Sequence, residues 1–283
     1  MLSNKVLLAT DFSETAEKLI NCLDELKGLG IDEVILTHVI NVHRSKVVNV
    51  DQFKETNQEK LEKVKEKIEA KGFKVTIKIP VGFPASEIKK VAQKENAALI
   101  LVASHGKGFI KKVFLGSTTY DLIRKSKRPV LIEKYDNIEG EAQVACARKF
   151  NKVLLPIDFS DCSKVAIDFV REMEENNFEE IILLNAIESS SSSEDLEKEK
   201  TKAEVKLKEL AKKIKNNGSV DRVTVKVTEG AASDNIIKIA QEEKVGLILM
   251  PRTGRGNIKE LLLGSTSDRV AKESPIPVLL ISC

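Results

Sequence analysis

Two loops in this chain have residue types that could hold a negatively charged ligand. The stretch "GKGFIKKVFLGST" occupies residues 106–118, and "GRGNIKELLLGST" occupies residues 254–266, 148 positions later. In each loop a glycine is followed by nine residues and then by Gly-Ser-Thr. Glycine lets backbone amides approach a ligand, and the Gly-Ser-Thr triplet begins a segment of helical period, so its amides would form a helix N-terminus. A phosphate suits this chemistry, and an ordinary turn before a helix is the alternative interpretation.

A second pair of chemically active residues consists of Asp11 and Asp158. They follow the apolar stretches "VLLAT" and "VLLPI", and each precedes Phe-Ser. A carboxylate there could cap a helix that begins near Ser13 or Ser160, or it could accept hydrogen bonds from a ribose or orient a divalent ion. The residues alone leave both roles open.

The two loops and the two aspartates are parts of a longer internal repeat. "KVLLATDFSE" (5–14) returns as "KVLLPIDFSD" (152–161), and residues 82–117 share 16 identities in 36 pairs with residues 230–265. Repetition of this length indicates a duplicated domain. We therefore predict a first domain, a linker and a second domain over residues 1–135, 136–149 and 150–283.

Each copy alternates short apolar runs with longer segments of helical period, which is typical of buried parallel strands and their crossover helices. In the first copy, helix signals include the cap Ser13 and the terminating Gly72, and in the second they include Ser160. The serine-rich segment 189–195 is interpreted as a solvated spacer. The strands of the first copy are expected near 5–10, 33–40, 74–79, 98–103 and 129–133.

This pattern predicts an α/β fold class with two doubly wound, five-stranded parallel sheets in the strand order 3-2-1-4-5. Ligands of such sheets bind beyond the carboxyl ends of the strands, where the winding direction reverses. In this order the reversal lies between the first and fourth strands. The aspartate follows the first strand and the glycine loop follows the fourth, so both are expected to meet there.

Composition excludes several other classes of protein. The 46 basic and 43 acidic residues are interleaved, and there is no Trp, so no nucleic-acid partner is expected. No apolar run approaches a membrane span, and neither CxxC spacing nor a repeated cysteine position indicates a zinc site or a repeated redox pair. His38, His43 and His105 are not repeated and complete no metal or catalytic set. We expect a reducing cytoplasm, no metal site, no catalytic residues and no membrane partner.

The combination of "DFSE", "HVI" and Gly-x2-Gly-x9-Gly-Ser resembles the universal stress protein family, as a tandem of two such domains over nearly the whole chain. The resemblance implies the adenine nucleotide alpha hydrolase-like fold, with AMP or ATP at the point where the winding reverses and Mg²⁺ as an accompanying ion. It also implies that the last strand of each copy pairs the two halves as an internal pseudo-dimer, and a homodimer of whole chains is a further expectation.

The resemblance also implies roles for individual residues. In the first copy it assigns Asp11 to ribose or metal, Ala9, Thr10 and the backbone at Val39 to the adenine, and Gly106, Gly116, Ser117 and Thr118 to the phosphates. The corresponding residues of the second copy are Pro156, Ile157, Asp158, Ala186, Gly254, Gly264, Ser265 and Thr266.

Both copies depart from the family pattern at its first glycine, which is Ala103 in one copy and Pro251 in the other. Alanine loses only the freedom to adopt positive φ, whereas proline also lacks an N–H group and restrains Met250. We therefore expect the second site to be the more disturbed of the two.

Three hypotheses about function follow. The first is a nucleotide-binding sensor or regulatory module of the stress response, which is not an enzyme. The second is an interaction or dimerisation protein whose sites have decayed. The third is a slow ATPase, for which Asp11 and Asp158 are the only candidate bases.

Overall fold

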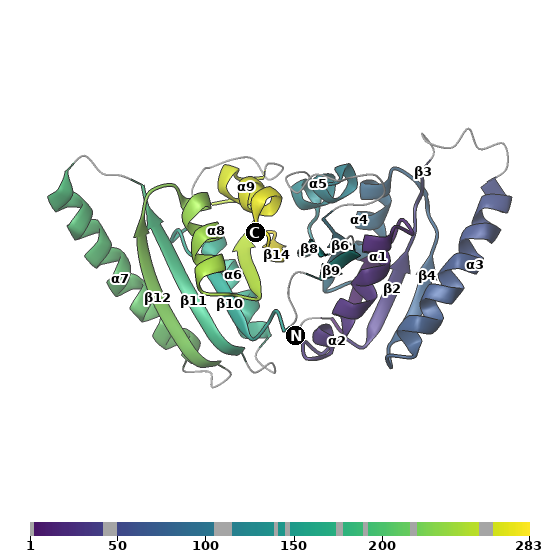
Figure 1. Cartoon of the computed structure of the whole chain (residues 1–283), viewed down its shortest axis with the longest axis horizontal. Helices are drawn as coiled ribbons and strands as arrows, with labels where there is room; N and C mark the ends of the chain where they lie inside the picture. Colours follow the sequence, from purple (N-terminus) through teal and green to yellow (C-terminus); the bar gives the residue numbers. More distant parts are fainter. Residues whose placement is uncertain are drawn as a thin grey trace. The chain divides into compact units, whose positions relative to one another are not determined.

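A computed structural model describes residues 3–41, 50–104, 115–138, 141–144, 148–173, 178–188, 192–215, 220–254 and 263–283. The chain divides into two compact units, Met1–Ala145 and Cys146–Cys283. Each unit has a parallel sheet flanked by helices, and so the predicted α/β fold class is confirmed (Figure 1). Within the described ranges, no helix has an apolar stretch long enough to cross a bilayer.

The first unit has five parallel strands in the order β4-β2-β1-β6-β7. Its strands are β1 (Lys5–Ala9), β2 (Glu33–Thr37), β4 (Lys74–Lys78), β6 (Leu99–Ala103) and β7 (Val130–Glu133), and the short pair β3 (Ile40–Asn41) and β5 (Val81–Gly82) lies beyond β2 and β4. Its helical segments are α1 (Glu14–Lys18), the 3₁₀ turn η1 (Leu19–Cys22), α2 (Leu23–Lys27), α3 (Val50–Glu69), α4 (Pro84–Lys94) and α5 (Ser117–Lys125).

The second unit repeats this plan in the order β12-β11-β10-β13-β14. Its strands are β10 (Lys152–Pro156), β11 (Phe178–Ile187), β12 (Val220–Glu229), β13 (Leu247–Pro251) and β14 (Val278–Ile281). Its helices are α6 (Asp161–Glu172), α7 (Ser193–Lys215), α8 (Ala232–Glu242) and α9 (Ser265–Glu273). The winding reverses between β10 and β13, because the chain moves outward from β10 to β12 and then returns to β13 on the other side.

The central strands are apolar on both faces because helices cover both faces of the sheet. Every residue of β6 and of β13 is buried. The edge strands β4 and β12 are only partly buried, and α3 and α7 lie along them (Figure 1). On the opposite face of the second unit, α8 and α9 lie side by side, joined by an ion pair between Arg269 and Asp234 at 2.6 Å.

The predicted helix caps are confirmed. Ser13 Oγ accepts a hydrogen bond from the Ala16 amide at the start of α1, and Ser160 Oγ accepts one from the Ser163 amide at the start of α6. Gly72, which we expected to close the second helix, follows α3 with φ +86°, a conformation that glycine adopts without strain. The first helix differs from the expectation because it tightens into η1, where Asn21 and Cys22 have low helix propensity.

Two connecting segments differ from the expectation. The predicted linker over residues 136–149 contains most of an antiparallel hairpin, which is formed by β8 (Tyr135–Ile138) and β9 (Glu141–Val144). These four-residue strands contain Asp, Asn and Glu, which have low β-propensity, so their backbone pairing leaves little signal in the sequence. The serine-rich spacer 189–195 is shorter than expected, because α7 begins at Ser193 and Ser192 Oγ accepts a hydrogen bond from the Asp195 amide.

Ion pairs between equivalent residues are present in both units. In the second unit, Glu243 contacts Lys226 Nζ at 2.6 Å and Lys152 Nζ at 2.9 Å, and Lys152 also contacts Glu180 at 3.1 Å. The equivalent contacts of the first unit join Lys78 to Glu95 and Lys5 to Glu33. The hydrogen bond from Lys226, followed by that from Lys152, lowers the pKa of Glu243 from 4.5 to about 2.

These ion pairs predict an acid-dependent loss of stability. A carboxylate whose pKa is lowered by folding stabilises the native state above its unfolded pKa and ceases to do so as the pH falls through its folded pKa. Glu243→Gln should therefore lower the free energy of unfolding of the second domain by about 1 kcal/mol at neutral pH, because partly solvated pairs contribute little. The difference between variant and parent should vanish as the pH falls from 4.5 to 2, as measured by urea unfolding. Glu242→Gln, which removes only a 3.8 Å contact with Lys238, is the control. An equal pH dependence in both variants would contradict the prediction.

Candidate functional site

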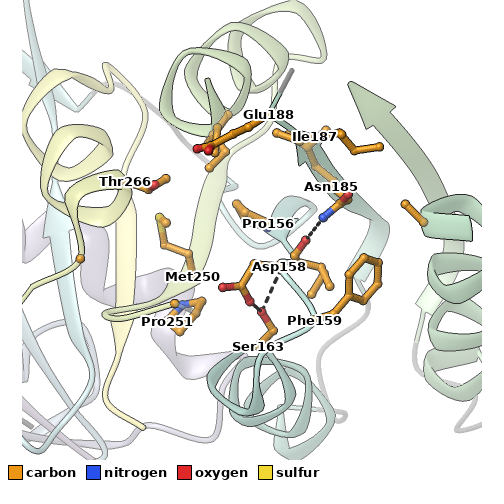
Figure 2. Close-up of a pocket in the computed structure, with 18 of the residues that line it drawn as sticks. Pro156, Asp158, Phe159, Ser163, Asn185, Ile187, Glu188, Met250, Pro251 and Thr266 are labelled. Atoms are coloured by element: carbon orange, nitrogen blue, oxygen red, sulfur yellow. Dashed lines mark hydrogen bonds between the residues drawn. The ribbon is translucent and has the colours of Figure 1, made fainter. Parts of the chain in front are cut away.

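A cavity of about 690 Å³ opens at the carboxyl ends of β10 and β13 in the second unit (Figure 2). Its walls come from the β10–α6 loop, the end of β11, one face of α7, the start of α8 and the β13–α9 connection. The eight residues predicted for the second copy all line it: Pro156, Ile157, Asp158, Ala186, Gly254, Gly264, Ser265 and Thr266. The structure therefore brings together residues that lie up to 110 positions apart in the sequence.

One end of this cavity is formed by the start of α9. Gly264 is the N-cap residue, and no side chain caps the helix. By contrast, Ser160 caps α6 on the other side of the cavity. Without a capping side chain, the amides of Ser265 and Thr266 in the first turn are suited to bind an anion. The resemblance implied that Gly264 contacts phosphate. Its amide instead donates a hydrogen bond to the Arg252 carbonyl at 3.0 Å.

The first unit repeats this helix start. Gly116 is the N-cap of α5, with no capping side chain, and its amide donates to the Ser104 carbonyl at 2.9 Å. Ser117 and Thr118 follow in the first turn, in the same positions as Ser265 and Thr266. Gly106 and His105 lie outside the described residues.

Ala103 and Pro251 stand where the family pattern has its first glycine, and their carbonyls accept equivalent hydrogen bonds in the two units. Thr119 Oγ1 in α5 donates to the carbonyl of Ala103 at 2.9 Å, and Ser267 Oγ in α9 donates to the carbonyl of Pro251 at 2.9 Å. Pro251 is the last residue of β13, as Ala103 is of β6. The contact between helix and strand end is therefore kept in the copy that carries proline.

Asp158 is held in place by the residues that begin α6. Its Oδ1 accepts hydrogen bonds from the Ser160 amide at 3.0 Å and from Ser160 Oγ at 2.6 Å. It also accepts one from Ser163 Oγ (Figure 2). Asp11 has the same bond to the Ser13 amide at 3.0 Å, but Ala16 replaces the second serine. The helix caps are Ser13 and Ser160 rather than the aspartates, and each aspartate accepts a hydrogen bond from the amide of the capping serine.

Gly254 approaches the other oxygen of this carboxylate. A Cβ atom at position 254 would lie 2.6 Å from Asp158 Oδ2, closer than atoms of a real side chain approach. At Gly264, by contrast, a Cβ would make ordinary contacts, of which the closest is 3.4 Å from the Arg252 carbonyl. A side chain at position 254 would therefore require the Asp158 carboxylate or the glycine segment to shift.

His38 and Asn185 occupy equivalent positions, and each bonds a main-chain carbonyl just after the first strand of its unit. His38 Nδ1 lies 2.9 Å from the Thr10 carbonyl, and Asn185 Nδ2 donates to the Ile157 carbonyl at 2.6 Å. Since a carbonyl only accepts, Nδ1 of His38 carries the proton. Both side chains fix the main chain just after the first strand of their unit, which explains why an amide can replace the imidazole. His43 lies outside the described residues, and the described parts of the chain contain no group of three or more potential metal-binding side chains.

Sequence reasoning missed an aromatic residue beside each aspartate. Phe12 and Phe159 adopt positive φ, 58° and 63°, which is unfavourable for a bulky residue. Lys60 Nζ lies 5.5 Å from the ring of Phe12, and Lys206 Nζ lies 5.2 Å from the ring of Phe159. Phe159 and Lys206 line the cavity, and Figure 2 shows Phe159 and Asn185 across the cavity from Thr266. The repeated Phe of "DFS" was the available signal.

Sequence reasoning also missed a disulfide bond between Cys162 and Cys283, which are 121 residues apart. Cys22 of the first unit is buried in the core and is not disulfide-bonded. The bridge could not be found from spacing, because the two cysteines belong to different elements and have no equivalents in the first copy.

Comparisons with known proteins agree with this architecture. The model of the universal stress protein family matches twice, at residues 3–134 and 149–282. Universal stress protein MJ0577 of Methanocaldococcus jannaschii is 36% identical over 159 residues, which cover 48% of this chain and 98% of that protein. The crystal structure of a universal stress protein from Archaeoglobus fulgidus aligns over 100% of this chain and 99% of that chain, with 29% identity and a TM-score of 0.77.

Proposed function

The chain belongs to the universal stress protein family, as two such domains in tandem, and on that premise we propose that it is a stress-response module that binds AMP or ATP at the carboxyl edge of each sheet. The observation that carries the proposal is the 690 Å³ cavity of the second domain, which has a size typical of small-ligand sites. The N-terminus of α9, which no side chain caps, lies at one end of the cavity, and apolar side chains line another part of it.

The phosphates are assigned to the end formed by α9. The feature that favours an anion there is the first turn of α9, whose amides are not capped by a side chain. Lys202 and Lys206 of α7 add positive charge to the same cavity, whereas Glu188 and Glu199 lie in its lining as well. The arrangement supports recognition of phosphate by backbone amides with help from lysine side chains.

The adenine is assigned to the apolar part of the cavity. Ile157, Ile236 and Met250 are all buried and line it, together with the strand end at Ala186. A flat purine gains hydrophobic stabilisation from such a wall, while the exposed backbone at a strand end can pair with the edge of the base. No protein ligand is assigned to Mg²⁺, since the carboxylate of Asp158 is engaged through Oδ1 with Ser160 and Ser163.

We propose a binding module and not an enzyme. A general base must reach the proton that it abstracts. Asp11 and Asp158, the candidate bases that the sequence suggested, already accept hydrogen bonds from the amides of Ser13 and Ser160. These hydrogen bonds support a role for the two carboxylates in positioning the starts of α1 and α6 rather than in proton transfer.

Calorimetric titration with ATP, and separately with AMP, tests this proposal. We expect two sites per chain, and a ligand that binds only the folded state should add about 2.7 kcal/mol to the free energy of unfolding at a hundredfold excess over Kd. Gly116→Val places branches beside the amides of α5 and should reduce the stoichiometry from two sites to one. The unfolding transition without ligand should stay at the parent temperature, which is the control for folding.

Other outcomes have distinct meanings. Unchanged stoichiometry in Gly116→Val would remove Gly116 from the site. The absence of any stabilisation by either nucleotide would favour the interaction protein with decayed sites. Phosphate released from ATP, in proportion to protein and lost in Asp158→Asn, would favour the slow ATPase.

A further inference from the structure

The disulfide of the second domain lies beside Thr253, a residue that lines the cavity. Cys162 is in the first turn of α6 and is partly buried, and Cys283 follows β14 by two residues and is exposed. Their Cα atoms are 5.2 Å apart. The bridge therefore joins the start of one helix to the chain that leaves the neighbouring strand.

Thr253 lies against both sulfur atoms. Its Oγ1 is 3.2 Å from Cys283 Sγ and 3.4 Å from Cys162 Sγ. Thr253 and the adjacent Gly254 line the cavity, and the preceding residue, Arg252, donates its amide to the Ile281 carbonyl at 2.8 Å. The bridge therefore contacts Thr253, and the next residue in the chain is Gly254, which lies close to the Asp158 carboxylate.

We propose that Cys162 and Cys283 form a thiol–disulfide exchange site that controls ligand affinity in the second domain, the bridged form binding more tightly. This inference rests on the proposed function for the identity of the ligand. In the bridged form, the start of α6, which positions Asp158 through Ser160 and Ser163, is tied to the end of β14. Thr253 is held between the two.

The direction of the effect follows from pre-organisation. After reduction the covalent tie is absent, so the segment of Thr253 and Gly254 must be ordered when the ligand binds. Ordering one or two side chains on binding weakens affinity by about three- to tenfold. The bridged form avoids this cost because the wall is already fixed.

The exchange reaction is balanced with a dithiol as reductant. A thiolate of the dithiol attacks the exposed Cys283 sulfur, the Cys162–Cys283 bond breaks, and Cys162 departs with the electron pair and takes up a proton. The start of α6 stabilises the departing thiolate, and the adjacent Asp161 carboxylate is paired with Lys164 at 2.7 Å. The second dithiol sulfur then displaces Cys283, so that the protein gains two electrons and the dithiol becomes a disulfide. In a reducing cytoplasm the thiol form is the resting state, and an oxidised dithiol forms the bridge by the reverse steps.

The first domain lacks this device and serves as an internal comparison. Counted from the repeated Asp-Phe-Ser, Thr15 stands in place of Cys162. Counted from the last strand, Tyr135 stands in place of Cys283. Affinity of the first domain should therefore be independent of the redox state.

The test combines mass spectrometry with calorimetry on the full chain. The Gly116→Val variant, in which ATP reports on the second domain alone, is equilibrated with reduced or oxidised dithiothreitol, and its bridged peptides are identified after thiol alkylation. We expect a Cys162–Cys283 linkage in the oxidised sample, and ATP affinity three- to tenfold higher than in the reduced sample. Cys162→Ser and Cys283→Ser should bind like the reduced protein in both buffers. Cys146→Ser, which removes a different cysteine of the same unit, should keep the response.

Absence of the linkage in every buffer would overturn the proposal, and so would equal ATP affinity of the bridged and reduced proteins. If no form binds ATP, the proposed function fails, and hydrogen exchange of residues 250–254 then decides the redox inference. Faster exchange after reduction would support a bridge that orders the cavity wall, and unchanged exchange would overturn it.

Discussion

Gly254→Ala is expected to weaken ATP binding to the second domain about a hundredfold while leaving the first domain unaffected. The new Cβ would lie 2.6 Å from Asp158 Oδ2, and this carboxylate cannot move freely because Oδ1 accepts three hydrogen bonds from Ser160 and Ser163. Relief of the clash requires loss of such bonds or displacement of the glycine segment. Hydrogen bonds to a charged group are worth about 1.5–3 kcal/mol each, and about 2.7 kcal/mol corresponds to a hundredfold change in Kd.

A double-mutant cycle identifies the clash as the cause. In an Asp158→Ala background the methyl group at position 254 meets no carboxylate, so Gly254→Ala should then cost little affinity. The measurement is calorimetric titration with ATP for the parent, both single variants and the double variant, each carrying Gly116→Val to silence the first domain. Equal losses in both backgrounds would show that the two residues act independently and would contradict the assignment.

Gly246→Ala is expected to destabilise the second domain by about 3 kcal/mol. Gly246 precedes β13, and a Cβ there would lie 2.5 Å from Lys149 Cα and 2.7 Å from the Lys149 carbonyl oxygen. Both are main-chain atoms, so no side-chain rotation relieves the overlap. Residues 148–150 or the start of β13 must shift, and the Gly246 amide would lose its 2.8 Å bond to the Lys152 carbonyl.

The equivalent position of the first domain supplies the matched control. Ala98 stands there and is buried, so the first domain already accommodates a Cβ. Ala98→Gly should cost only about 1 kcal/mol, through lost burial of one methyl group and added backbone freedom. Urea unfolding followed by hydrogen exchange of each domain separates the two effects. Similar losses in both variants would show that the contact with Lys149 is not decisive.

Much of the architecture was predictable because its causes are local. Buried parallel strands need uninterrupted apolar runs, so β1, β6, β10 and β13 were visible as such. Ser13 and Ser160 were recognisable as caps since a hydroxyl before a helical period satisfies a nearby amide. The hairpin of β8 and β9 was not predicted. Its strands are short and are paired through the backbone, and their polar residues form no alternating apolar pattern.

The residues of the candidate site were also predictable, but for a topological reason. In a doubly wound sheet, the ends of the first and fourth strands must be neighbours, so Asp158 and the 254–266 loop could be placed together before any coordinates were known. Their exact contacts could not be. Residue spacing does not specify atomic positions. It could not show that Gly254 lies close to the Asp158 carboxylate, or that the Gly264 amide is hydrogen-bonded to the Arg252 carbonyl.

The sequence by itself therefore determined the duplication, most of the strands and helices, and the edge of the sheet at which the cavity of the second unit opens. Only the tertiary structure decided which residues of different elements contact one another. The disulfide of Cys162 and Cys283, the aromatic ring of Phe159 under Lys206, and the close packing of Gly246 on Lys149 each join residues of different elements. Periodicity reports which face of an element is buried, whereas contacts between elements depend on how their faces are packed together, and a single sequence carries no direct record of that packing.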